Sequence, residues 1–227
     1  FLLAQAVGGV FDNMDEIVNY YGGGIPTNGF DMYYQVNNSY PGMIYVNAQG
    51  DRVGAEESAT SAMWYGQEES KLYAVISGNM IDEEQSFIKH PMMNSAVLEN
   101  NGWDKLEELA AEGNCVYKAD TIEELAEKID RDPVELQATI DEWNAACDAG
   151  VDAEFGRDPE KMAKIDTAPY YAVSITPTLV ATTGGAKRDT AGRVLNWNNE
   201  PIAGLYEAGE LGSYVANLYQ NGVFLSE

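Results

Sequence analysis

The sequence has few of the residues that build metal sites and disulfide frameworks. It contains two cysteines and one histidine in 227 residues. Cys115 and Cys147 lie far apart, in a strand-like and a helical context, so they cannot form a CxxC pair or a metal knuckle. We therefore predict no metal site and two free thiols, with a disulfide between them as the alternative.

Basic residues and long apolar runs are also scarce. Thirteen Lys and Arg stand against 37 Asp and Glu, which gives a net charge of -24 and repels phosphate backbones. No run of 18 apolar residues is present, and the opening FLLAQAVGGVF lacks the basic flank of a signal peptide. We predict no nucleic-acid partner and no membrane span, while cytoplasmic and exported locations both stay open.

A dinucleotide-binding GxGxxG turn is missing as well. The glycines of YGGGIPTNG (21–29) have the wrong spacing and open no periodic helix, so we interpret them as a plain loop. With 45% hydrophobic and 11% aromatic residues, the chain has enough apolar content for packed domains.

The middle of the chain carries regular signals of both helices and strands. Alternation and a turn at Ala48-Gln49-Gly50 predict a hairpin, and KLYAVIS predicts a strand. Apolar spacing, the capping box Thr121-x-x-Glu124 and the Asp132-Pro133 cap predict helices. These helices cover 104–113, 121–130 and 134–150. Strands and a hairpin through NNEPIAG are expected after residue 170, so the fold class is α+β.

Three segments resemble the flavoprotein subunits of the fumarate reductase and succinate dehydrogenase family, in the branch with urocanate reductase and 3-ketosteroid dehydrogenases. The C-terminal stretch from PYYAVSIT to QNGVFLSE carries most of the likeness. MIYVNAQGDRVGAEE is similar to the family's I-x-V-N-x-x-G-x-R-F-x-N-E segment. WNAACDAGVDAEFGR matches a further family segment through Asn144, Cys147, Gly150, Asp152, Phe155, Gly156 and Arg157.

The resemblance implies a domain organisation in which a capping domain interrupts an FAD-binding domain. Residues 1–37 would end the first FAD-binding segment, 38–180 would form the cap, and 181–227 would begin the returning segment. Because the chain starts without Met and lacks GxGxxG, we expect it to be a fragment without the nucleotide-binding start and most of the last helix. The full-length protein would bind FAD, whereas this chain alone would not retain it.

The cofactor contacts that the resemblance implies lie near the C-terminus. Glu210, after Gly209, would accept a ribose hydrogen bond, although a solvated turn carboxylate is the alternative. A helix start formed by Asn221, Gly222, Val223 and Phe224 would meet flavin N1 and O2. A turn formed by Thr183 and Gly184 would lie beside the ring, with a plain β-turn as the alternative.

Departures from the family argue against fumarate as the substrate. The family's His-Thr-Met-Gly-Gly turn, whose His holds a carboxylate, reads Ala181-Thr182-Thr183-Gly184-Gly185 here. The family's Ala-Asn-Arg near the C-terminus becomes Asn217-Leu218-Tyr219, and the catalytic Arg has no counterpart. The dicarboxylate clamp is therefore missing.

Tyr219 is the predicted catalytic acid, with Tyr214 as a weaker candidate. Tyr219 followed by Gly222 resembles the ketosteroid dehydrogenase arrangement. A phenol of pKa about 10 is protonated at pH 7 and can donate a proton, whereas a base role needs its pKa lowered by about three units. An aromatic packing residue is the alternative for Tyr219.

Arg52 and Glu56 are the remaining predicted catalytic residues. They match family positions on the edge of the cap that faces the site, and exposed hairpin charges are the alternative. Together these predictions describe an oxidoreductase that needs an electron donor and reduces an activated C=C bond of a small non-dicarboxylate substrate. Ketosteroid dehydrogenase-like desaturation and a non-catalytic binding module stay open.

Overall fold

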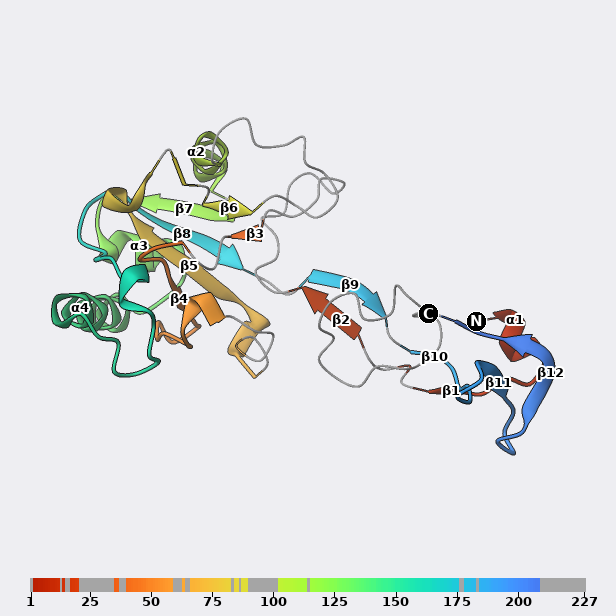
Figure 1. The fold of residues 1–227 in the computed structure, drawn as a ribbon. Helices are drawn as coiled ribbons and strands as arrows, with labels where there is room; N and C mark the ends of the chain where they lie inside the picture. The colour runs from red at the N-terminus through yellow and green to blue at the C-terminus, as the bar shows by residue number, and fades with distance from the viewer. Residues whose placement is uncertain are drawn as a thin grey trace. The chain divides into compact units, whose positions relative to one another are not determined.

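The chain forms two compact units in a computed structural model (Figure 1). The structure describes residues 2–12, 14, 17–20, 35–36, 40–58, 63, 66–82, 84–85, 87–89, 102–113, 115–175, 178–182 and 184–208. Unit 1 comprises Phe1–Tyr20 with Leu179–Glu227, and unit 2 comprises Tyr21–Thr178. The chain therefore leaves unit 1 after its first segment and returns to it after completing unit 2.

A four-stranded antiparallel sheet forms the centre of unit 2. Its order is β4 (Ile44–Val46), β5 (Leu72–Ser77), β8 (Tyr170–Ile175) and β7 (Val116–Ala119). The β5 strand, predicted from KLYAVIS, pairs with β8 over its whole length. Every β5 residue is buried, which explains why its sequence is a nearly continuous apolar run and lacks alternation.

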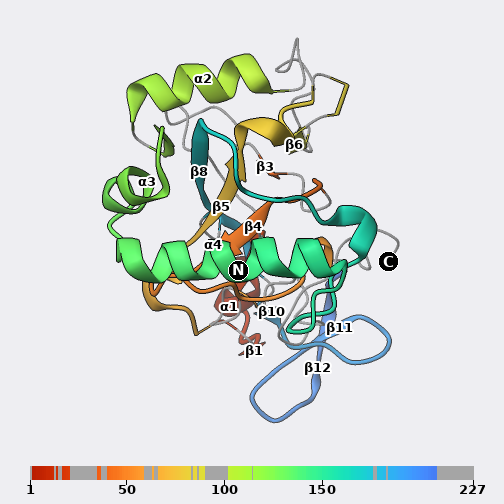
Figure 2. The ribbon, with the colours of Figure 1, turned by 90° about the vertical axis from the view of Figure 1, so that its left-hand side faces the viewer.

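Three helices accompany this sheet, and Figure 2 shows α4 crossing one side of it. They are α2 (Trp103–Glu112), α3 (Ile122–Lys128) and α4 (Pro133–Ala149). Thr121 Oγ1 accepts a hydrogen bond from Glu124 N at 3.1 Å, and Asp132 Oδ1 accepts one from Val134 N at 2.8 Å. The predicted N-caps are confirmed, and Gly150, at φ 67°, ends α4 as expected.

The predicted hairpin after β4 is present and returns the chain to Arg52. Asn47 Oδ1 accepts hydrogen bonds from the N–H groups of Gln49 and Asp51, and Val46 forms an antiparallel bridge with Arg52. Four short 3₁₀ helices complete the described connections: η1 (Glu56–Ser58), η3 (Glu68–Ser70), η4 (Gly78–Met80) and η5 (Pro159–Lys161). A separate pair joins β3 (Gln35–Val36) to β6 (Ile88–Lys89).

Unit 1 is built from short strand pairs. Its elements are α1 (Leu2–Ala6), β1 (Phe11–Asp12), β2 (Ile17–Tyr20), β9 (Thr178–Thr182), β10 (Gly185–Ala186), β11 (Arg193–Leu195) and β12 (Pro201–Tyr206). The pairs are β1 with β10, β2 with β9, and β11 with β12. The hairpin predicted through NNEPIAG is the β11–β12 pair, so both ends of the chain contribute strands to this unit.

The structure confirms a fold of mixed helices and strands. Cys115 is buried, Cys147 is half-buried, and both are free thiols, as predicted. The assignment of 1–37, 38–180 and 181–227 to FAD-binding and capping segments stays a prediction. In the described part of the chain, no helix is long and apolar enough to cross a membrane.

Candidate functional site

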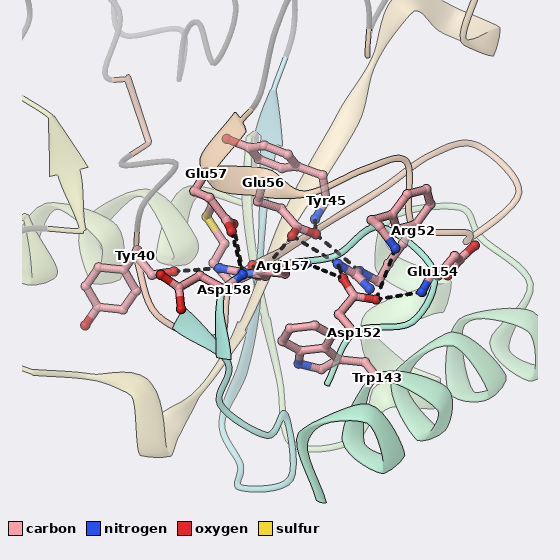
Figure 3. A network of polar contacts seen from close by, with 12 residues as sticks. Tyr40, Tyr45, Arg52, Glu56, Glu57, Trp143, Asp152, Glu154, Arg157 and Asp158 are labelled. Atoms are coloured by element: carbon pink, nitrogen blue, oxygen red, sulfur yellow. Dashed lines mark hydrogen bonds and ion pairs between the residues drawn. The ribbon is translucent and has the colours of Figure 1, made fainter. Parts of the chain in front are cut away.

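A buried cluster of ion pairs in unit 2 is organised around Glu56, the first residue of η1 (Figure 3). Glu56 is fully buried. Its Oε1 accepts a hydrogen bond from Tyr45 N at 3.1 Å, while its Oε2 lies 3.2 Å from Arg52 Nη2 and 2.9 Å from Arg157 Nη1. Arg52 Nε also donates to Oε1 at 3.3 Å, so one carboxylate oxygen is occupied by β4 and Arg52 and the other by two guanidinium groups.

Arg157 connects the cluster to the segment that enters β4. Its Nη2 donates to Tyr40 O at 3.1 Å, and its Nη1 also donates to Met43 O. Its Nε lies 3.2 Å from Glu57 Oε2, in an ion pair without hydrogen-bond alignment. The fully buried guanidinium group thus holds two backbone carbonyls and two carboxylates.

Asp152 closes the cluster on the side of Arg52. Its Oδ2 lies 3.1 Å from Arg52 Nη2, and its Oδ1 accepts hydrogen bonds from the N–H groups of Glu154 and Phe155. Burial alone would raise the pKa of Asp152, but the hydrogen bond and charge of Arg52 outweigh it and lower that pKa. Burial would likewise lower the pKa of Arg52, and the charge of Glu56 and the hydrogen bond of Asp152 raise it instead.

Aromatic rings cover the two guanidinium groups. The centre of the Arg52 guanidinium lies 4.5 Å from the Trp143 ring centroid and 5.2 Å from that of Phe155. Arg157 lies 5.2 Å from the same indole. Trp143 Nε1 donates to Ala163 O at 2.9 Å, which fixes the indole plane. Such desolvated cation–π contacts contribute about 2 kcal/mol.

The chemistry of this cluster is that of a structural clamp. Two arginines face three carboxylates, namely Glu56, Glu57 and Asp152, and the oxygens of Glu56 and Asp152 already accept hydrogen bonds. An open cavity of about 790 Å³ borders Arg52, Trp143 and Phe155, but the Arg52 side chain is only 5% exposed and directs its donors at Glu56 and Asp152. Both arginines are therefore paired with carboxylates in the described part of the site, and neither offers a free positive charge to a substrate.

The structure places the predicted site residues in two groups. It brings Arg52 and Glu56 together, and the alternative of exposed hairpin charges is wrong because the cluster buries both. Their catalytic role stays a prediction, which the paired geometry does not favour. Gly184 lies in unit 1 and is buried. The others lie outside the described residues: Thr183, Gly209, Glu210, Tyr214, Tyr219, Asn221, Gly222, Val223 and Phe224.

The sequence predicts no role for Asp152 and Arg157. Both stand in the segment WNAACDAGVDAEFGR, directly after the end of α4. The sequence signal that could have found them is charge complementarity between the two segments of family resemblance. One segment contributes Arg52 and Glu56, and the other contributes Asp152 and Arg157. The contacts join residues 100 and 101 positions apart, so no local pattern could pair them.

In unit 1, the described surroundings of Gly184 suit a cofactor that approaches the backbone closely. Gly184 and Gly185 are buried and carry no Cβ, and β10 is held by β1 through the Phe11–Ala186 and Asp12–Gly185 pairs. A carboxylate oxygen in the same unit, Oε2 of Glu207, is buried and has no hydrogen-bond partner in the described part. A glycine turn and an unused buried acceptor fit a ligand with hydrogen-bond donors, such as FAD.

Comparison with known proteins identifies the class of this chain. The model of the FAD binding domain family matches residues 37–222, which include the clamp of unit 2 and the glycine turn of unit 1. The chain belongs to this family of FAD-binding proteins.

Individual relatives and a solved structure agree with this assignment. An NADH:acrylate oxidoreductase of Vibrio harveyi is 43% identical over 112 residues, which are 49% of this chain and 11% of that protein. A probable fumarate reductase of Shewanella frigidimarina is 26% identical over 216 residues, covering 92% of this chain and 32% of that protein. The crystal structure of 3-ketosteroid Δ1-dehydrogenase from Sterolibacterium denitrificans superimposes with a TM-score of 0.71 at 23% identity, over 92% of this chain and 40% of that chain.

The chain spans a third or less of the length of these two curated relatives. The solved structure supports the fold, and the family match supports the cofactor class.

Proposed function

We propose that this chain is part of an FAD-dependent oxidoreductase that reduces an activated C=C bond of a small substrate with no more than one carboxylate. The observation that carries the proposal is the 43% identity with a protein named for acrylate, whose double bond is conjugated to a single carboxylate. The sequence is consistent with such a substrate, since Ala181 and Tyr219 stand where the family's dicarboxylate clamp has His and Arg.

Bound FAD would supply a hydride from N5 to the β carbon of the substrate. Tyr219 would donate a proton to the α carbon, for which an ordinary phenol is already in the required state at pH 7. The N–H of Gly222 would polarise the activating carbonyl of the substrate. Glu210 would hold the ribose, and the backbone at Gly184 would let the ring approach.

The clamp around Glu56 would serve this site indirectly in the proposed enzyme. By fixing η1, the hairpin and the loop after α4 to one another, it would give unit 2 a single rigid shape to present to the substrate. Arg52 and Glu56 would then be positioning residues and would not act as acid or base.

A tyrosine exchange tests the proposed chemistry. In the full-length protein that carries this chain, Tyr219→Phe removes the proton donor and leaves the ring, so reoxidation of the reduced flavin by the substrate should slow by about 10²–10⁴-fold. Tyr206→Phe, an exposed position on β12, is the matched control and should react within a few-fold of the unchanged protein. The readout is stopped-flow absorbance of the flavin under anaerobic conditions. Equal rates for the two variants would remove Tyr219 from the mechanism.

A further inference from the structure

The strand β7 forms one edge of the four-stranded sheet of unit 2 (Figure 1). On its inner side it pairs with β8, and Ser174 N donates to Cys115 O at 2.8 Å in the same ladder. Because hydrogen-bonded and non-hydrogen-bonded pairs alternate along an antiparallel ladder, the backbone groups of Val116 and Lys118 point away from β8. An edge of this kind presents hydrogen-bonding groups to any extended chain that reaches it.

The opposite edge of the sheet is closed by the clamp around Glu56. The backbone N–H of Tyr45, on β4, donates to Glu56 Oε1. Val46 forms its antiparallel bridge with Arg52 on the side of β4 that faces away from β5. A carboxylate and the return of the hairpin therefore occupy this edge, so it is covered by parts of the chain itself.

At the β7 edge, a lysine covers one of the outward backbone groups. Lys128 lies in the last turn of α3, and its Nζ donates to Lys118 O. The side chain of Lys118 is engaged elsewhere, because its Nζ lies 2.9 Å from both carboxylate oxygens of Glu107 on α2. Lys118 is thus fixed by α2 through its side chain and by α3 through its carbonyl.

Room for an approaching chain remains beside this lysine. An open cavity of about 430 Å³ lies between α2, β7 and α3, and Lys128 lines it. Ala110 and Ala111 line it on α2, and Ala119 lines it on β7. These small side chains leave space along the edge, so the ammonium group of Lys128 stands between the solvent and the outward carbonyl of β7.

We propose that Lys128 blocks the β7 edge and thereby prevents it from pairing with the β7 edge of a second copy of this chain. A second copy brings an edge of identical length, and a two-fold symmetric contact would place both Lys128 side chains in one interface. Pairing would bury or displace these two ammonium groups, which is why lysines on edge strands oppose association. This role is independent of FAD and of the proposed reaction.

Removal of the ammonium group tests the proposal on the 227-residue chain. Lys128→Met keeps most of the length of the side chain and removes its hydrogen-bond donors. In sedimentation equilibrium at increasing protein concentration, the dissociation constant of the dimer should fall by on the order of tenfold, the size of one hydrogen bond gained. The exchange also makes the net charge more negative, which by itself opposes association.

Three further variants locate the contact. Lys128→Arg keeps the donors and should behave like the unchanged chain. Ala111→Lys in the Lys128→Met background places a new ammonium group in the same cavity and should restore the dissociation constant of the unchanged chain. Lys161→Met is the matched control, because it makes the same exchange on η5, outside the lining of this cavity, and it should leave association unchanged.

Each other outcome decides against the proposal. Equal dissociation constants for Lys128→Met and the unchanged chain, or stronger association that Ala111→Lys does not reverse, overturn it. Lys128 is exposed, so Lys128→Met should keep the far-ultraviolet circular dichroism and the melting temperature of the unchanged chain. Loss of that signal would show that Lys128 stabilises the fold and would also overturn a role in blocking the edge.

Discussion

Glu56 shows how a single residue can look catalytic in a sequence and structural in the fold. A carboxylate beside an arginine in a family segment suggests acid–base chemistry, yet Glu56 is buried and its two oxygens accept four hydrogen bonds, from Tyr45, Arg52 and Arg157. A buried ion pair is costly to break because removing one partner leaves an uncompensated charge.

Glu56→Gln should therefore destabilise unit 2 by about 3–5 kcal/mol. The amide keeps the shape of the side chain but removes the charge that faces Arg52 and Arg157. Urea denaturation followed by tryptophan fluorescence measures the loss, since Trp143 packs against both guanidinium groups. Glu154→Gln, an exposed change in the neighbouring loop, should stay within about 0.5 kcal/mol. Similar small effects for both variants would show that the clamp does not stabilise the unit.

At the scale of elements, the turn into β4 depends on a glycine for two reasons. Gly42 has φ 79°, and a Cβ at this position would lie 2.6 Å from Met80 Cε and 2.8 Å from Ala163 Cβ. Its N–H also donates to Lys161 O at 2.8 Å. The turn therefore packs directly on the segment after η5, and Arg157 holds the neighbouring carbonyls of Tyr40 and Met43.

Gly42→Ala should cost roughly 2–4 kcal/mol, the sum of backbone strain and overpacking. Gly156→Ala is the matched control, because Gly156 has φ 71° but nothing within 4 Å of a built Cβ, so strain alone should cost about 1 kcal/mol. Thermal denaturation of the two variants separates the contributions. A control as unstable as Gly42→Ala would mean that packing at this turn adds nothing.

The elements themselves could be predicted from the sequence where their signals are local. Asp132–Pro133 and Gly150 bracket α4, and the turn at Ala48–Gly50 forms the hairpin, because caps and turns are decided by a few adjacent residues. The clamp could not be predicted, since its ion pairs join residues about a hundred positions apart. The cofactor residues near Tyr219 came from family resemblance alone and lie outside the described part of the chain.

At the scale of the whole molecule, the chain is organised as one unit interrupted by another. Its first and last segments contribute the paired strands β1 and β10, and unit 2 is inserted between them. The family match extends from residue 37 to residue 222 and so includes most of unit 2 and most of the C-terminal segment of unit 1. A cofactor site near Gly184 and a rigid unit 2 are then separate parts of one proposed enzyme.

The most direct test is to purify the full-length protein that carries this chain, reduce its flavin anaerobically and follow reoxidation against a panel of enoates, enones and steroids. The account predicts that the protein contains bound flavin and that one class of small α,β-unsaturated compound reoxidises it, with the saturated compound as product. Fumarate should not reoxidise the flavin. Bound flavin that no acceptor reoxidises, or oxidised flavin that a saturated 3-ketosteroid reduces, would contradict it.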